Sequence, residues 1–218
     1  MLHFHVITLF PESIEPYLKA SIIGRAVAAK KIKISYYDPK RFTRDKYGRV
    51  DRRPYGGGPG MVLEPDAILR AASKALSKGS PWTKGKSEIV FFATDGKTFD
   101  EVEAKRLSKK KDILFICGHY EGIDARVQKI LKAKKVSVGP YVLTGGELPA
   151  ATVIDAIARH VPGVLGKTES LEASRVSSPE VYTRPEVLVW KGKKHRVPKV
   201  LLTGHHAKIN EWKQKRRK

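Results

Sequence analysis

Short apolar runs are the strongest constraint on how this 218-residue chain can fold. Ile89–Phe92, Ile113–Ile116 and Val136–Val138 are too short for buried helices, and stretches with helical spacing separate them. Strands that are apolar on both faces are typical of parallel sheets with helices on both sides. The sequence therefore predicts an α/β domain with a mostly parallel sheet.

The remaining elements follow from the same spacing. Asp38 to Gly60 is a long basic loop, which is typical of a functional or disordered segment. Gly166 to Ser178 is polar and poorly periodic and predicts a linker, and a small basic helical unit is expected after Tyr182. Two further strands are predicted at Phe4–Leu9 and Ile32–Tyr37, and helices at Ser21–Ala29, Pro65–Ala75 and Leu148–His160.

Three glycine-rich breaks stand out from these elements. Thr144-Gly145-Gly146 follows an apolar run and precedes a helical pattern. Two adjacent glycines remove both Cβ atoms, so the backbone can turn sharply and a ligand can approach main-chain groups. A tight turn without a ligand gives the same pattern. The other two breaks, Pro54–Gly60 and Cys117–Asp124, also contain aromatic or acidic residues, which favours a binding site over turns alone.

The kind of cofactor is indicated partly by missing motifs. The chain has neither a Gly-x-x-x-x-Gly-Lys-Ser/Thr loop nor a Gly-x-Gly-x-x-Gly turn, so phosphate groups lack their usual cradle. A cofactor without phosphates is favoured. S-adenosylmethionine fits, because backbone groups can hold its adenine and its sulfonium needs only nearby carbonyl or carboxylate oxygens.

Charge indicates the partner. A formal net charge of +21 calls for a polyanion, usually nucleic acid, although a ribosomal or nucleoid protein would have the same charge. A membrane surface is the other polyanion, but there is no long apolar span and no secretory signal at Met1. Cys117 is the only cysteine, which excludes an intramolecular disulfide and a cysteine-based zinc site.

The three breaks also carry a family resemblance. Their motifs, His119–Asp124, Tyr141–Pro149 and Pro54–Met61, resemble those of the bacterial tRNA (guanine-N1)-methyltransferases, which modify position 37 beside the anticodon. The resemblance runs from Phe10 to Lys208. It implies methylation of N1 of guanosine 37 by a cytoplasmic homodimer, with tRNA as the partner, S-adenosylmethionine as the cofactor, and no membrane or DNA partner.

The resemblance also implies a fold that periodicity alone would not indicate. It is an α/β fold with a trefoil-knotted SPOUT methyltransferase domain over residues 1–165, a linker over 166–181 and a small, mostly helical tRNA-binding domain over 182–218. In this family the linker of one subunit meets the cofactor pocket of the other. True knots are rare, so ordinary connection rules would instead draw an open sheet with right-handed crossovers.

The expected cofactor contacts follow from the same resemblance. Glu121 would lie near the methionine end of the cofactor, although acids in a first helical turn, Glu121 and Asp124 among them, can simply cap a helix. The implied cofactor-binding residues are Ala93, Thr94, Gly118, Glu121, Val138, Gly139, Pro140, Tyr141, Val142, Leu143, Gly145, Gly146 and Pro149.

Methylation at guanine N1 requires a base for the N1 proton and a positive group at O6. Arg159 is the candidate for O6, although an i,i+4 ion pair with Asp155 would also explain it. Family members usually carry an aspartate before a serine in the linker, and Ala173 stands there. The adjacent Glu172 is the tentative base, and a solvated linker with no catalytic role is the alternative reading.

Three smaller departures from the family pattern accompany Ala173. Pro140 stands where an aspartate is common, Arg52 replaces the second of two aspartates before Pro54, and the sequence stops at Lys218 without a further Arg-Pro-containing tail. Two alternatives to the enzyme therefore stay open. One is another RNA methyltransferase of the same fold, and the other is a non-catalytic RNA-binding protein that retains the fold.

RNA contacts are expected in the basic loop and near the end of the chain. Aromatic and cationic residues alternate over 190–196 and 212–218, so bases can stack while phosphates are neutralised, although a solvated basic tail has the same composition. No metal ligand is predicted, because the neighbouring His205 and His206 would point about 100° apart on a helix. The RNA-binding candidates are Arg41, Arg44, Arg49, Asp51, Tyr55, Gly56, Gly57, Gly58, Lys194, Arg196, His205 and Lys208.

Overall fold

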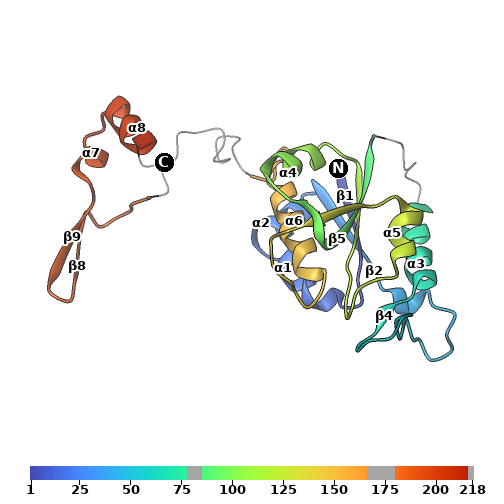
Figure 1. Cartoon of the computed structure of the whole chain (residues 1–218). Helices are drawn as coiled ribbons and strands as arrows, with labels where there is room; N and C mark the ends of the chain where they lie inside the picture. The colour runs from blue at the N-terminus through green and yellow to red at the C-terminus, as the bar shows by residue number, and fades with distance from the viewer. Residues whose placement is uncertain (78–84, 166–179, 216–218) are drawn as a thin grey trace. The chain divides into compact units, whose positions relative to one another are not determined.

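The protein divides into two compact units. A computed structural model describes residues 1–77, 85–165 and 180–215. The first unit covers 1–165 and the second covers 166–218. Figure 1 shows the first unit as a sheet between helices and the second as a hairpin with short helices. Each unit is described by itself below.

A five-stranded sheet forms the centre of the first unit. Its strand order is β2-β1-β6-β5-β7, and every neighbouring pair is parallel. The mostly parallel sheet predicted from the apolar runs is therefore confirmed. The strands are β1 (Leu2–Ile7), β2 (Ile32–Tyr37), β5 (Ser87–Thr98), β6 (Asp112–Ile116) and β7 (Lys134–Ser137).

Helices cover both faces of this sheet (Figure 1). Alternate residues of one strand point to opposite faces, so Phe4 and Val6 enter one core cluster while Ile7 enters the other. The first cluster is completed by α1 (Glu15–Lys19), α2 (Ser21–Ala28), α4 (Glu101–Leu107) and α6 (Glu147–Ala158), and the second by α3 (Pro65–Ser77) and α5 (Ala125–Leu131). Short 3-10 turns, η1 (Pro11–Ser13) and η2 (Pro39–Arg41), and a small antiparallel pair, β3 (Asp51–Arg52) and β4 (Val62–Leu63), complete the unit.

Strand β5 is longer than the apolar run that predicted it. Its pairing with β7 is interrupted, so that Val136 is opposite both Phe92 and Lys97. A side chain at Gly96 would place its Cβ 2.5 Å from the backbone nitrogen of Val136, so only glycine fits there. The irregularity carries Ala93 and Thr94 to the end of the sheet where the functional site lies.

The second unit differs from its prediction. A mostly helical unit was expected, but it begins with an antiparallel hairpin of β8 (Val187–Trp190) and β9 (Lys193–Arg196), followed by α7 (Lys199–Leu202) and α8 (His206–Lys215). The two turn residues, Lys191 and Gly192, both have positive φ, at 47° and 74°. This two-residue turn matches the right-handed twist of paired strands. The lysine content of the segment obscured the hairpin in the sequence.

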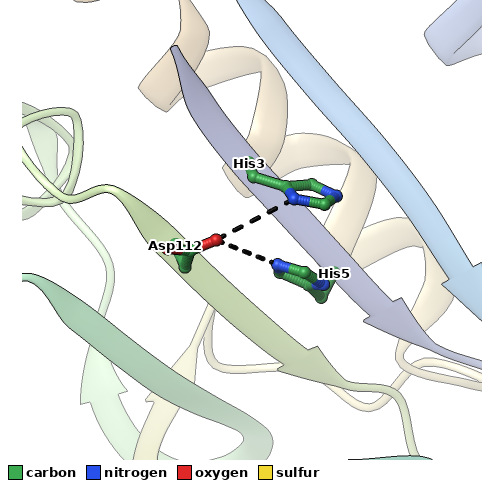
Figure 2. Close-up of side chains that lie close together, drawn as sticks. All are labelled: His3, His5 and Asp112. Carbon is green, nitrogen blue, oxygen red and sulfur yellow. Dashed lines mark hydrogen bonds and ion pairs between the residues drawn. The ribbon is translucent and has the colours of Figure 1, made fainter. Parts of the chain in front are cut away.

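A polar cluster lies within the sheet where β1 and β6 begin (Figure 2). His5 is almost fully buried; its Nε2 lies 3.2 Å from Asp112 Oδ1 and its Nδ1 lies 3.0 Å from the Tyr37 hydroxyl. His3 reaches Ser35 Oγ at 2.9 Å. Burial lowers the pKa of His5, although Asp112 opposes this effect. These contacts satisfy polar groups that would otherwise destabilise the sheet.

Glu88 connects three elements through one buried carboxylate. Arg106 of α4 donates two hydrogen bonds of 3.1 Å to it, and Lys134 of β7 also pairs with it. Burial alone would raise the pKa of Glu88, but the hydrogen bonds from Arg106 and Lys134 hold it below its ordinary value. The carboxylate therefore stabilises the fold only while it is ionised.

The variant Glu88→Gln should lower the free energy of unfolding at neutral pH by about 2 kcal/mol, because the partly buried Arg106 loses one of its two carboxylate partners and Lys134 loses its pair. A carboxylate whose pKa is depressed by folding contributes stability above its unfolded pKa and loses it as the pH falls. The difference from the wild type should therefore shrink below pH 4.5, the ordinary value for this group. Denaturant unfolding followed by circular dichroism checks this, with the exposed Glu12→Gln as the control. Equal effects of the two variants would contradict it.

Candidate active site

A pocket lies at the carboxyl ends of β5, β6 and β7, where ligands commonly bind in α/β folds. Its volume is about 340 Å³. Three segments form its walls, namely the middle of β5 where its pairing with β7 becomes irregular, the turn after β6 and the loop between β7 and α6. The lining residues are Phe91, Phe92, Ala93, Thr94, Gly118, His119, Tyr120, Glu121, Gly122, Ile123, Val136, Ser137, Val138, Gly139, Tyr141, Val142, Leu143, Thr144, Gly145, Gly146 and Pro149.

Two of these segments are joined through their main chains. The backbone N–H of Gly146 donates to the carbonyl of Gly118 at 2.8 Å, and His119 and Gly145 form an isolated β-bridge. A Cβ on Gly146 would lie 2.6 Å from the Cα of Cys117. The φ of Gly146 is −83°, within the range of any residue. Close approach of two backbones, rather than an unusual turn, is therefore what requires glycine at 146.

The structure brings the predicted cofactor residues together. All of them line the pocket except Pro140, whose exposed ring lies outside the lining. Tyr141 folds back so that its hydroxyl donates to the carbonyl of Val138 at 3.2 Å. A ligand contact for each of these residues stays a prediction, because only their position around one cavity is observed.

Sequence reasoning missed a polar network behind the pocket. The buried side chain of Glu147, in the first turn of α6, accepts a hydrogen bond of 2.7 Å from the Thr8 hydroxyl. Its other oxygen lies 4.0 Å from Nδ1 of His119, and that buried nitrogen has no hydrogen-bond partner in the described part of the chain. His119 belongs to the same motif as Gly118 and Glu121, and this could have identified it as a candidate.

The glycine-rich segment 54–60 leads into a strand docked beside the pocket. Leu63 N donates to Gly122 O at 3.0 Å, and Glu121 N donates to Met61 O at 3.0 Å. A Cβ on Gly60 would collide with the Glu121 side chain at 2.5 Å. These contacts hold the end of the basic loop against the pocket turn. Gly56, Gly57 and Gly58 all have positive φ and open space around them, and the Tyr55 side chain is fully exposed.

Asp124 has the structural role considered for it in the sequence. Its carboxylate caps α5 by accepting from the backbone N–H of Arg126 at 2.9 Å. The Arg126 side chain also donates to it, and this hydrogen bond lowers the pKa of Asp124. Glu121 caps no helix and lies exposed at the pocket.

Helix α6 links the pocket to the predicted catalytic arginine. It begins next to Gly146, and Arg159 lies half-buried at its other end. The carboxylate of Asp155 accepts a hydrogen bond of 2.6 Å from the Tyr17 hydroxyl. Glu172 and Ala173, the predicted base and the position it replaces, lie outside the described residues.

Two arginines of the basic loop form ion pairs with the carboxylate of Asp45. Arg49 and Arg52 both approach Asp45, at 3.2 Å and 3.6 Å, and hydrogen bonds from Arg49 lower the pKa of this acid. Arg52 also pairs with Glu64 at 2.5 Å, which explains a basic residue where the family often has an aspartate. The predicted Arg41 and Arg44 are exposed on the same loop, and Asp51 lies in β3, partly buried.

The other predicted RNA contacts belong to the second unit. Lys194 and Arg196 lie on β9, His205 precedes α8 and Lys208 lies within it. All four are exposed. The same unit contains a ring contact between Tyr182 and Trp212, whose centroids are 6.2 Å apart.

The pocket differs in charge from the rest of the chain. Within the described residues no lysine or arginine lines it, whereas the whole sequence has 43 lysines and arginines against 22 acids. Glu121 lies at its wall and Glu147 behind it. Burial raises the pKa of the Cys117 thiol, which excludes it as a thiolate nucleophile.

One group of described residues has the spacing of metal ligands. Single nitrogen or oxygen atoms of His3, His5 and Asp112 all lie within 4.8 Å of one another, at the opposite end of β1 from the pocket. The sequence analysis predicted no metal ligand, and Asp112, far along the chain, could not have been associated with the two histidines. Hydrogen bonds with Ser35, Tyr37 and Asp112 already occupy both ring nitrogens of His5 and one of His3.

None of the described helices has the length and apolar character needed to cross a membrane.

Comparison with known proteins places the chain in a family. The family described as tRNA (Guanine-1)-methyltransferase TrmD matches residues 2–218.

Two relatives named tRNA (guanine-N(1)-)-methyltransferase illustrate the similarity. The protein from Pseudoalteromonas atlantica is 41% identical over 97% of this chain and 78% of its own length. That from Clostridioides difficile is 39% identical over 98% of this chain and 91% of its own length. The chain therefore belongs to the tRNA (guanine-1)-methyltransferase family.

Proposed function

We propose that this enzyme transfers the methyl group of S-adenosylmethionine to N1 of guanosine 37 in tRNA. Family membership makes it a tRNA (guanine-N1)-methyltransferase. The observation that carries the choice of cofactor is the absence of lysine and arginine from the described pocket lining, in a chain of net charge +21. Such a pocket disfavours phosphates and suits a ligand that carries positive charge.

The pocket also has a size and lining that suit S-adenosylmethionine. Its volume, about 340 Å³, lies in the range of small-molecule sites, which is roughly 300–1,000 Å³. The apolar walls include Val138 and Leu143, and the glycines at 118, 145 and 146 leave main-chain groups accessible beside them. An adenine ring can lie flat on this surface, with Glu121 near the sulfonium. S-adenosylmethionine supplies the electrophilic methyl carbon of the reaction.

In the proposed reaction one residue of the chain would accept a proton from the guanine, and another would stabilise the negative charge that develops on it. The Glu172 carboxylate would accept the proton of guanine N1, so that this nitrogen could bond to the methyl group that S-adenosylmethionine would supply, with a neutral thioether as the leaving group. Arg159 stabilises the negative charge that collects on O6 during proton loss.

We also propose that the enzyme works as a homodimer with a knotted cofactor domain. Exposed apolar side chains at or near the pocket support the homodimer, namely those of Tyr141, Val142 and Leu148, and the knot rests on family membership. A monomer gains nothing from exposing them together, whereas a subunit interface would bury them. The unit of residues 1–165 would be the methyltransferase domain, and 182–218 would bind tRNA after a linker over 166–181.

A non-catalytic RNA-binding role is the second candidate. One observation favours it, because Ala173 occupies the family's usual position for the catalytic aspartate and an alanine cannot accept a proton. The pocket would then be a remnant of the methyltransferase fold.

The first experiment measures transfer of labelled methyl from S-adenosylmethionine to tRNA transcripts that carry guanosine or adenosine at position 37. We expect transfer to the guanosine transcript alone, with the product identified as 1-methylguanosine by mass spectrometry of the nucleosides. Tight tRNA binding without transfer would favour the non-catalytic role.

The variant Glu172→Gln tests the proposed base. We expect methyl transfer to slow by about 10²- to 10⁴-fold, the usual contribution of a general base, while the Kd for S-adenosylmethionine is unchanged. Single-turnover kinetics and calorimetry measure the two quantities. Glu169→Gln, nearby in the same segment, is the matched control and should retain the wild-type rate. An unchanged rate in Glu172→Gln would sink this assignment without affecting the family.

The variant Gly146→Ala tests the main-chain contact beneath the pocket. Its new Cβ would lie 2.6 Å from the backbone of Cys117, so the two loops must separate and the affinity for S-adenosylmethionine should fall at least tenfold. In the matched variant Gly139→Ala the three atoms nearest the methyl group all belong to the Tyr141 side chain, the nearest at 2.2 Å, and this exposed ring can rotate away. We expect a much smaller loss there. Equal losses in two folded variants would refute the argument.

A further inference from the structure

A second groove lies at the amino ends of the strands, the opposite end of the sheet from the pocket. It has a volume of about 620 Å³ and is formed by the turns that lead into β1, β2, β5 and β6, together with the segment after α6. Nothing in the proposed reaction uses it. Lysines dominate its lining, namely Lys30, Lys31, Lys86, Lys109, Lys110 and Lys111, beside Met1, Leu2, Ser108, Val161 and Pro162.

The positive charge of this groove is almost uncompensated. No aspartate or glutamate lines it, and within the described residues Lys110 is the only one of the six lysines that pairs with a carboxylate, at 3.5 Å from Glu88. Lys30, Lys31, Lys86, Lys109 and Lys111 are all exposed. Some exposed cations elsewhere on this unit, such as Lys19, Arg52 and Lys135, are by contrast paired with a carboxylate. A cluster of unpaired like charges is unfavourable by itself and is stabilised by an anionic ligand.

The backbone fixes the lysines relative to one another. Lys111 donates its N–H to the carbonyl of Lys86 at 2.7 Å, and its own carbonyl accepts from His3 at 2.9 Å. The carbonyl of Lys31 accepts from the N–H of Leu2 at 3.4 Å. Three lysine-bearing turns are thus attached to the same short stretch of β1. Cations on a fixed frame lose less entropy on binding a polyanion than cations on a free tail.

The composition of the groove indicates which anion it suits. Several ammonium groups spread along an open groove match a chain of spaced phosphates better than a single small anion. No aromatic residue lines the groove, so unstacked bases would find no ring on which to stack. Lysine contacts of this kind position a nucleic-acid backbone without reading its sequence.

We propose that this lysine groove binds the phosphodiester backbone of the tRNA substrate outside its anticodon loop. The inference rests on the proposed function, which supplies tRNA as the substrate. The pocket and the lysine groove lie at opposite ends of the same strands, so one RNA segment in the pocket leaves the lysine groove to a different segment. The lysine groove then contributes affinity and orientation but no chemistry.

The test compares two triple variants of the full-length enzyme. Lys31→Gln, Lys109→Gln and Lys111→Gln together remove charge from the groove, and Lys105→Gln, Lys129→Gln and Lys132→Gln remove the same charge from exposed positions elsewhere. Filter binding measures the Kd for a full-length tRNA transcript, for its isolated anticodon stem-loop and for an unrelated RNA duplex, over a range of salt concentrations. Calorimetry with S-adenosylmethionine confirms that both variants retain the pocket.

The groove variant should bind full-length tRNA about tenfold more weakly at low salt and should reduce the slope of log affinity against log salt by about 2, as expected for the loss of three phosphate contacts. Its affinity for the stem-loop should match that of the wild type, and the control variant should bind both as the wild type does. If the groove variant lost affinity only for the unrelated duplex, the groove would bind an RNA backbone other than that of the tRNA substrate, and the proposal would be wrong about the ligand.

Several outcomes would overturn the proposal. Equal weakening by the two triple variants would show a general effect of net charge, and unchanged binding of all three RNAs would show that the groove holds no RNA. Co-sedimentation with anionic phospholipid vesicles is measured for the same variants, and loss of vesicle binding with unchanged RNA binding would assign the surface to a membrane. The test measures binding and not methyl transfer. A wild-type enzyme that transfers no methyl group would therefore refute the proposed function, and the binding data would still decide whether the groove binds tRNA.

Discussion

A main-chain contact between two loops is the constraint on which the site depends. Gly146 donates to the carbonyl of Gly118, and no side chain fits between Gly146 and Cys117. The contact closes one wall of the pocket and fixes where α6 begins. It also positions Glu147 against Thr8 and, through the length of α6, sets the distance from the pocket to Arg159. A change at one glycine would therefore disturb several parts of the site at once.

Separation of charge is the second organising feature. The chain is strongly basic, and many of its cations lie on the loop around Asp45, along the lysine groove and over the second unit, while the described pocket wall has none. Attraction of RNA and retention of a positively charged cofactor would conflict if they shared one surface. The proposed assignment of the two ligands to different surfaces would allow one small protein to bind a polyanion and a cation together.

The sheet and most helix positions were predictable because apolar spacing reports burial directly, as the runs at Ile89, Ile113 and Val136 show. The pocket lining came from glycine-rich motifs and a family resemblance rather than from physics alone. The Thr8–Glu147 contact and the lysine groove join residues far apart in the sequence, and no local pattern indicates such pairs. The hairpin of β8 and β9 was missed because its charged residues do not resemble a strand that packs on a core.

The glycine-lined pocket has a consequence for sequence divergence. Where a ligand meets N–H and C=O groups, the contacting atoms are those that every residue carries, so substitutions nearby leave the chemistry of recognition unchanged as long as the backbone path is kept. The relative from Pseudoalteromonas atlantica differs from this chain at more than half of the aligned positions, with 41% identity. A recognition surface made of peptide groups is a physical means by which enzymes can drift this far apart and still accept the same small molecule.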